Sequence, residues 1–270
     1  MAALPPCGTV PARPPRSPNR GASIERVEAI LFDWDGTLID SLGAFHRANA
    51  TVMDSFGLPF DVIRYRQHYT ADWREMYRRL GVPDDRLEDA NTLWQRTFAA
   101  NDDKVIAFAG VDTALRRLAA AGIVIGIVTA GHREVVEPQL GATGLGSLLP
   151  IRVYGDDLPV HKPDPEPLRL ALRLAGDGHR PETSIYVGDA PTDMQMAAAV
   201  GARGIGIESV LGERAELIAA GASEVAPSVA EWVDAHLAVR ARGDGSPTGD
   251  GRPATDGAPT TDGPPTTDGR

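Results

Sequence analysis

The chain has 270 residues, of which 42% are hydrophobic and 24% charged, a balance typical of globular proteins. Its formal net charge of −10 argues against nucleic acid as the main partner, because binding to a phosphate backbone needs a basic surface. Cys7 is the only cysteine and no apolar run approaches transmembrane length, so we expect no intrachain disulfide, no membrane partner and a cytoplasmic location.

Low-complexity segments are predicted at both ends of the sequence. Residues 1–23 are rich in Pro, Arg, Gly and Ser and have no periodic apolar pattern. From about Arg240 the chain repeats Thr-Asp-Gly with Pro between the copies. Neither segment has enough apolar side chains to bury, so we predict disordered tails at 1–23 and 240–270.

The first predicted strand, Val27 to Phe32, is a short apolar run that ends at Asp33, a pattern typical of a strand buried on both faces. After it, from Leu42 to about Asp103, the sequence has helical patterns and no strand. We predict helices over Leu42 to Phe56, over Val62 to Leu80 as two helices, and over Asp84 to Ala100 with Asp84 as the N-cap. An all-helical insert at this point predicts a cap, residues 43–104, over a core formed by 24–42 and 105–239.

The rest of the chain alternates between helices and strands. Helices are predicted over residues 111–121, 132–140, 165–174 and 192–200, and strands over 123–128, 151–154, 184–187 and 204–207. This alternation predicts the α/β class, with a parallel sheet covered by helices on both faces.

Two carboxylates follow the first strand, in the segment Asp33-Trp34-Asp35-Gly36-Thr37-Leu38. Alternate residues of a strand share a side, so Asp33 and Asp35 can face one space at the carboxyl end of the sheet, where ligands of such sheets bind. Carboxylates this close repel each other unless a cation or a shared proton intervenes, and Mg²⁺ suits their oxygen ligands.

Other strand ends carry matching chemistry. Thr129-Ala130-Gly131 follows the second strand and offers a hydroxyl and backbone amides before a helix, which favours anion binding. Lys162 lies in the segment His161-Lys162-Pro163-Asp164-Pro165, whose prolines fix the backbone, and it can clamp a phosphate or orient a carboxylate. Asp189 and Asp193 follow the fourth strand and add two more carboxylates suited to a metal.

This ordered set resembles the haloacid dehalogenase superfamily, in its phosphoglycolate phosphatase and β-phosphoglucomutase-like branch, over roughly Val27 to Trp232. The resemblance implies a Rossmann-like core, a Mg²⁺ cofactor, Asp33 as nucleophile and Asp35 as general acid and base. It implies phosphate binding by Thr129, Ala130 and Lys162. It also implies metal contacts from the Asp33 side chain, the Asp35 backbone carbonyl and Asp189, with Asp193 in support.

A phosphatase acting on a small phosphorylated metabolite is the function that this pattern favours, with a monomer or a weak dimer as its state. Two alternatives stay open: a phosphosugar mutase on the same core, and a non-catalytic binding protein on the same fold. Substrate choice is expected in the cap, where residues 64–74 are rich in polar and aromatic side chains. We predict substrate contacts from Trp73 and from Arg74, since arginine suits a second anionic group.

Overall fold

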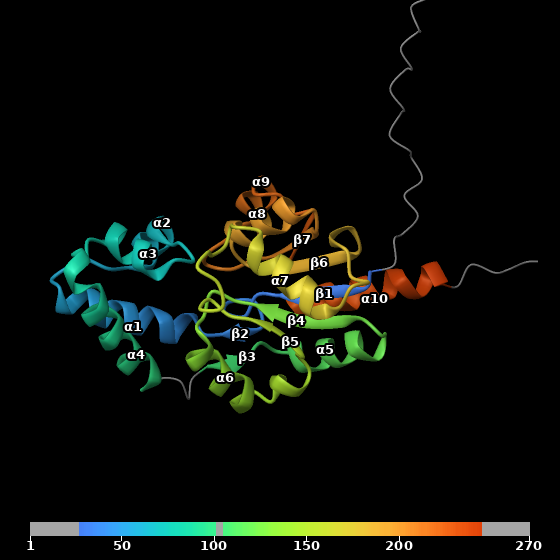
Figure 1. Cartoon of the computed structure of the whole chain (residues 1–270), viewed down its shortest axis with the longest axis horizontal. Coiled ribbons are helices and arrows are strands. Elements are labelled where there is room, and N and C mark those ends of the chain that lie inside the picture. Colours follow the sequence, from blue (N-terminus) through green and yellow to red (C-terminus); the bar gives the residue numbers. More distant parts are fainter. Residues whose placement is uncertain (1–26, 101–104, 245–270) are drawn as a thin grey trace, which may run out of the picture.

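In the computed structural model, which describes residues 27–100 and 105–244, six parallel strands form the central sheet. The strands run in the order β5-β4-β1-β6-β7-β8 (Figure 1). Their bounds are β1 Ala29–Phe32, β4 Val124–Val128, β5 Ile151–Val153, β6 Ser184–Gly188, β7 Arg203–Ile207 and β8 Glu224–Ala226. The parallel α/β fold predicted from the sequence is confirmed, with β8 as an additional strand at one edge.

Alternate residues of β1 point to opposite faces of the sheet and enter two separate cores. Ile30 and Phe32 pack into one core, while Leu31 packs into the other, and all three are fully buried. The first face is covered by α5 (Val111–Ala120), α6 (Arg133–Ala142) and α10 (Val229–Asp244). The second is covered by α7 (Glu166–Ala175) and α8 (Pro191–Val200), with α9 (Arg214–Ala219) packed beside them near the edge of the sheet. Both faces are therefore covered, as parallel sheets require.

Four helices gather at one end of the molecule, apart from the helices that cover the sheet (Figure 1). These helices are α1 (Leu42–Ser55), α2 (Val62–His68), α3 (Trp73–Leu80) and α4 (Leu87–Ala99). They share a core of their own, in which Met53, Tyr77 and Leu80 are buried. We call this group the cap.

One predicted cap detail was wrong. Asp84 is not the N-cap of the fourth helix, because it begins a short 3₁₀ turn, Asp84–Arg86, and Arg86 then precedes α4. The Asp84 carboxylate instead pairs with Arg78 at 2.6 Å, so its charge is satisfied by the preceding helix.

The two chain segments that join cap and core lie side by side. β2 (Ile39–Asp40) precedes α1, β3 (Ile106–Ala107) follows the cap, and the two pair antiparallel. Each has only two residues, which is too short to give a periodic signal in the sequence. A second link joins cap and core through Arg66 of α2, which pairs with Glu213 at 2.8 Å and also with Glu216.

The last helix, α10, extends to Asp244, beyond the predicted start of a tail at residue 240. Arg240 explains the difference, because its guanidinium donates to the carbonyls of Val27 and Ala121 at 3.2 and 3.4 Å and so docks the helix end on the core. The predicted tail at 1–23, the rest of the predicted C-terminal tail and the last cap residues, 101–104, lie outside the described residues.

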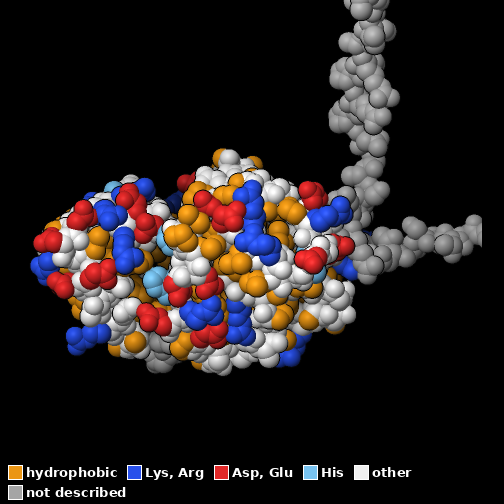
Figure 2. Space-filling view, viewed as in Figure 1, with side chains coloured by type: hydrophobic (Ala, Val, Ile, Leu, Met, Phe, Trp, Pro, Cys, Tyr) orange, Lys and Arg blue, Asp and Glu red, His pale blue; other side chains and the backbone are white. Residues whose placement is uncertain are grey.

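The described surface carries both signs of charge. On the face shown in Figure 2, acidic and basic side chains are interspersed over cap and core. Within the described parts of the chain, no helix combines the length and the apolarity needed to cross a membrane.

Candidate active site

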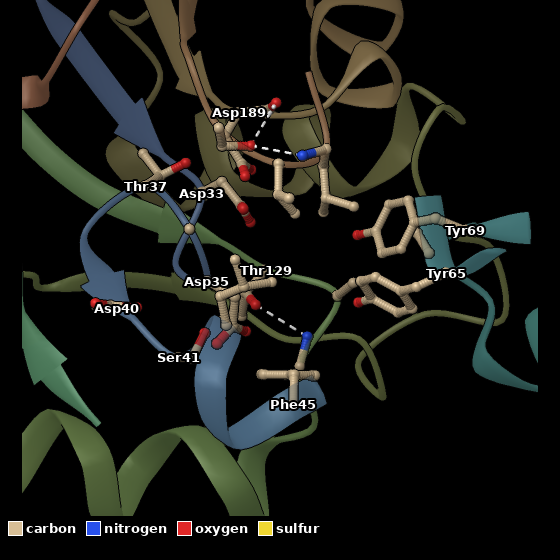
Figure 3. Close-up of a pocket in the computed structure, with 18 of the residues that line it drawn as sticks. Asp33, Asp35, Thr37, Asp40, Ser41, Phe45, Tyr65, Tyr69, Thr129 and Asp189 are labelled. Carbon is tan, nitrogen blue, oxygen red and sulfur yellow. Dashed lines mark hydrogen bonds between the residues drawn. The ribbon is translucent and has the colours of Figure 1, made fainter. Parts of the chain in front are cut away.

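The three central strands each end at a polar side chain. Asp33 follows β1. Thr129 follows β4, which pairs with β1 on one side, and Asp189 follows β6, which pairs with β1 on the other side. Because the strands are parallel, their carboxyl ends share one edge of the sheet. Figure 3 shows Asp33, Asp35, Thr129 and Asp189 around a common space, as the sequence pattern predicted.

A buried lysine joins two of the carboxylates. Lys162 Nζ lies 2.6 Å from Asp33 Oδ1 and 2.8 Å from Asp193 Oδ1, and all three side chains are buried. Asp193 Oδ2 in turn accepts a hydrogen bond from the backbone N–H of Ala190 at 3.0 Å. Lys162 therefore holds the Asp33 carboxylate by one oxygen. Of the two roles that the sequence suggested for this lysine, orienting a carboxylate fits this geometry.

Burial shifts the acidity of the site. Removal from water raises the pKa of Asp33 to about 7, although Lys162 opposes the shift. Burial also raises the pKa of Asp35 to about 6, and a hydrogen bond from Ser41 opposes this increase. The pKa of Asp189 is also raised well above its usual range, by burial and then by Asp33 and Asp193. One lysine does not balance the three buried carboxylates of Asp33, Asp189 and Asp193 together with the half-buried Asp35, so the site favours a further cation.

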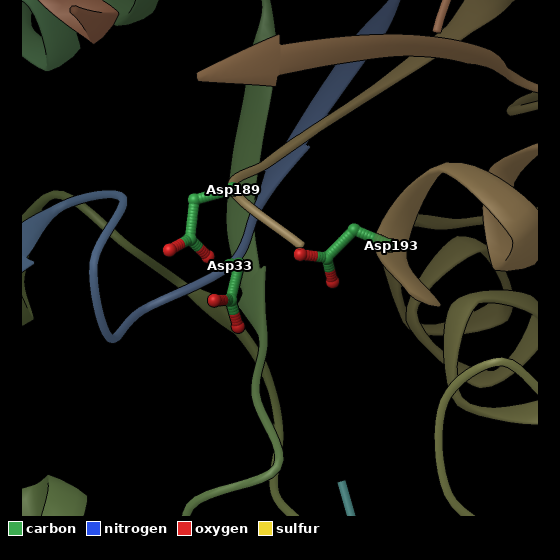
Figure 4. Close-up of side chains that lie close together, drawn as sticks. All are labelled: Asp33, Asp189 and Asp193. Atoms are coloured by element: carbon green, nitrogen blue, oxygen red, sulfur yellow. The ribbon is translucent and has the colours of Figure 1, made fainter. Parts of the chain in front are cut away.

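Three of these carboxylates have oxygens close enough together to hold one metal ion. Asp33, Asp189 and Asp193 each offer an oxygen, and these oxygens lie within 4.8 Å of one another (Figure 4). An all-oxygen set of buried carboxylates fits a hard divalent cation. The Asp35 side chain is not part of this cluster: it lies beside Thr129 and Ser41, and its Oδ1 is buried without a hydrogen-bond partner.

Thr129 orders the loop that follows β4. Its Oγ1 accepts a hydrogen bond from the backbone N–H of Gly131 at 2.9 Å, so the hydroxyl proton stays available to a ligand. Thr129, Ala130 and Gly131 all line the cavity beside the carboxylates. The predicted anion-binding loop therefore lies where a phosphate bound next to Asp33 could meet it.

Gly36 lets the loop after β1 pass close to Asp189. Its φ is +77°, and a Cβ built on it would lie 2.3 Å from Asp189 Oδ2. No other residue type fits both the left-handed backbone and this contact.

We expect Gly36→Ala to lower the free energy of unfolding by about 3 kcal/mol and to reduce kcat/KM by about 10²-fold, because the added methyl group displaces Asp189. Chemical denaturation and a phosphate-release assay measure the two effects. Gly57→Ala is the matched control: Gly57 also has a positive φ, +68°, but nothing lies within 4 Å of its Cβ position. It should cost about 1 kcal/mol and keep full activity, and equal effects of the two variants would contradict the steric explanation.

A cavity of about 470 Å³ lies between the carboxylates and the cap. Trp73, one of the two predicted cap contacts, lines it. The other predicted contact, Arg74, does not line the cavity: its guanidinium stacks on Trp73 at 4.3 Å and pairs with Glu88 at 2.8 Å. Its contact with a second anionic group of the substrate stays a prediction.

Two cap tyrosines are site residues that the sequence did not single out. Tyr65 and Tyr69 reach from the cap with their hydroxyls toward the acidic side chains (Figure 3). Burial, and then the charges of Asp35 and Asp189, raise the pKa of Tyr65, so its hydroxyl stays protonated and can donate. Both lie in the predicted polar-aromatic stretch, but only the fold of α2 and the loop after it shows which members face the site.

Comparison with known proteins places the chain among hydrolases. Residues 30–207 match the family model of the haloacid dehalogenase-like hydrolases. The chain is 29% identical to a phosphoglycolate phosphatase of Pseudomonas putida, over 66% of this chain and 68% of that protein. It is 30% identical to phosphoglycolate phosphatase 1 of Pseudomonas aeruginosa, over 64% of this chain and 66% of that protein. The match thus spans slightly less than two thirds of the length of that relative. It is 32% identical to the pyrophosphatase PpaX of Bacillus velezensis, over 68% of this chain and 84% of that protein.

Solved structures show the same fold. A haloacid dehalogenase-like hydrolase structure from Bacteroides fragilis matches with a TM-score of 0.70 and 26% identity, over 77% of this chain and 100% of that one. CbbY from Rhodobacter sphaeroides, solved in complex with phosphate, matches with a TM-score of 0.65 and 25% identity, over 76% of this chain and 96% of that one.

Proposed function

We propose that this chain, which belongs to the haloacid dehalogenase-like hydrolase family, is a Mg²⁺-dependent phosphatase that hydrolyses a small phosphate monoester through an aspartyl-phosphate on Asp33. The observation that carries the proposal is the buried arrangement of Asp33, with Lys162 on one of its oxygens and Asp35 and Asp189 beside it. The named phosphatases among the relatives support the same reaction class.

In the first step, an Asp33 carboxylate oxygen attacks phosphorus and the bond from phosphorus to the ester oxygen breaks. Lys162 holds Asp33 Oδ1 at 2.6 Å, which orients the carboxylate for the attack. The departing alkoxide needs a proton, and Asp35 can supply it, because burial raises the pKa of its carboxyl group to about 6. Burial raises the pKa of Asp33 further, to about 7, so Asp33 would need a bound Mg²⁺ beside Lys162 to stay ionised for the attack.

In the second step, Asp35, now ionised, takes a proton from a water molecule, whose oxygen attacks the phosphorus of the aspartyl-phosphate. The acyl-phosphate bond breaks, Asp33 is regenerated and inorganic phosphate leaves. The Thr129 hydroxyl and the loop amides around Ala130 would donate to the phosphate oxygens in both steps. Mg²⁺, held by Asp33, Asp189 and the Asp35 backbone carbonyl with Asp193 in support, would neutralise the negative charge of the transferred group.

The test is phosphate release from p-nitrophenyl phosphate with and without millimolar Mg²⁺. We expect turnover only with the metal. We also expect Mg²⁺ alone to raise the melting temperature by about 5–10 °C, because it compensates buried carboxylates only in the folded protein. The Asp189→Asn variant should remain folded and lose most of this shift. Full turnover after chelation, or a shift unaltered by Asp189→Asn, would contradict the metal site.

The mutase alternative finds less support in the structure. A phosphosugar mutase must hold a second phosphate in the cap while the first reacts, and that role suits arginine or lysine. In the part of the chain that the structure describes, neither residue type lines the cavity. We therefore place hydrolysis ahead of isomerisation.

A further inference from the structure

The wall of the cavity that faces the carboxylates is aromatic. Six of its side chains are Phe45, Tyr65, Tyr69, Trp73, Tyr77 and Trp94. They pack as three pairs of rings: the ring centres of Phe45 and Trp94 lie 5.4 Å apart, those of Tyr65 and Tyr69 5.8 Å apart, and those of Trp73 and Tyr77 5.8 Å apart. Such a wall favours a flat apolar group, which it can contact without desolvating charges.

The charged groups of the cavity have one sign. Besides Asp33, Asp35 and Asp189, the lining includes Asp40 and Glu208. Among residues 27–100 and 105–244, no lysine or arginine lines it. Lys162, which pairs with Asp33, lines a small neighbouring pocket that shares Thr129 and Ala130 with the cavity.

Three arginines of α2 and α3 make contacts away from this wall. Arg64 donates through Nη2 to the carbonyl of Leu80 at 3.3 Å, while its buried Nε has no hydrogen-bond partner. Arg66 pairs with Glu213, and Arg74 pairs with Glu88. A second anion on the substrate would therefore be desolvated near carboxylates without a cation to receive it, which is strongly unfavourable.

The remaining polar groups of the wall are neutral. Asn49 is buried, and its Oδ1 accepts a hydrogen bond from the Tyr77 hydroxyl at 3.0 Å, while its Nδ2 has no partner. Asn91 and Thr70 also line the cavity. Amides and hydroxyls of this kind bind the hydroxyl or carbonyl groups of an uncharged molecule.

From these observations we infer that the ester substrate releases an uncharged alcohol that carries an aromatic ring, and that esters with a carboxylate or a second phosphate are poor substrates. This inference rests on the proposed phosphatase function and concerns the leaving group alone. It separates the chain from its named relatives, whose names refer to phosphoglycolate and pyrophosphate, both of which carry an additional charge.

The experiment compares three esters of primary alcohols: 2-phenylethyl phosphate, ethyl phosphate and phosphoglycolate. We expect kcat/KM for 2-phenylethyl phosphate to exceed that for ethyl phosphate at least about tenfold, through contact of the ring with the aromatic wall. Phosphoglycolate should be no better than ethyl phosphate. A preference for phosphoglycolate would overturn the inference and leave the phosphatase function intact. No hydrolysis of any ester by protein that Mg²⁺ stabilises would overturn the proposed function, and this inference with it.

A charge inserted in the wall gives a second test. Asn91→Lys places a cation in the cavity, whereas Thr92→Lys places the same cation on the exposed side of α4 one residue later. Asn91→Lys should raise the ratio of kcat/KM for phosphoglycolate to that for 2-phenylethyl phosphate at least about tenfold, and Thr92→Lys should leave it unchanged. Equal ratios in Asn91→Lys and the unaltered protein would overturn the inference.

Discussion

Replacing Asp33 by asparagine should lower kcat for phosphate release by about 10⁴-fold or more while the protein stays folded. The amide cannot attack phosphorus, so the aspartyl-phosphate cannot form. The fold should survive because Lys162 keeps its other partner, Asp193, at 2.8 Å. Steady-state phosphate release and a thermal melt measure the two properties on the same sample.

The control for Asp33→Asn is the same chemical change at a distant acidic residue. Asp112 is exposed on α5 and pairs with Arg116 at 3.0 Å, outside the cavity. Asp112→Asn should keep full activity. If Asp33→Asn retained a tenth of the normal kcat, Asp33 would not be the nucleophile, and another carboxylate of the cluster would have to take that role.

Replacing Lys162 by methionine should have the largest effect on stability. The side chain is buried between Asp33 and Asp193, and its removal leaves both carboxylates without their cation. We expect a loss of about 3–5 kcal/mol in the free energy of unfolding, measured by urea denaturation without metal. Activity should fall at least about 10²-fold, because Asp33 loses the group that orients it.

Two further variants separate the buried ion pair from ordinary surface charge. Arg203→Met removes an exposed cation that pairs with Glu224 at 3.0 Å, and it should cost less than about 1 kcal/mol. The double variant Lys162→Met with Asp193→Asn should be more stable than Lys162→Met alone, because one uncompensated charge is also removed. A double variant less stable than Lys162→Met would show that packing around Lys162, rather than charge, sets its contribution.

The place of the polar side chains at the carboxyl edge of the sheet could be predicted from the sequence, because strand ends are local features. β1 is buried on both faces and therefore appears as an unbroken apolar run, so that Asp33 marks its end. The runs that end at Thr129 and Asp189 can be identified in the same way. Parallel pairing then brings these ends to one edge without any further information.

The cap contacts could not be identified in this way, because helical residues change direction by about 100° at each step. Trp73 and Arg74 are neighbours in α3, yet Trp73 lines the cavity and Arg74 turns toward Glu88. The sequence shows that both are in the cap, but the choice between them depends on how α3 packs. For the same reason the absence of a cationic group from the described cavity lining became apparent only in three dimensions.

Short elements were missed for a different reason. β8 has three residues and α9 has six, lengths at which an apolar repeat cannot be distinguished from chance. The last turns of the final helix dock on the core through an arginine that donates to two backbone carbonyls, and the local sequence pattern does not predict such a tertiary contact.

Because β2 pairs antiparallel with β3, the point where the chain leaves the core for the cap lies next to the point where it re-enters the core. Asp33 and Asp35 precede this junction, and Thr129, Lys162 and Asp189 follow it. The segment between Asp40 and Ile106 can therefore be exchanged as one contiguous cassette without changing the order of the reactive side chains. We therefore expect that exchanging this segment can change which molecule is accepted, while the side chains proposed to carry out the reaction keep their places in the core.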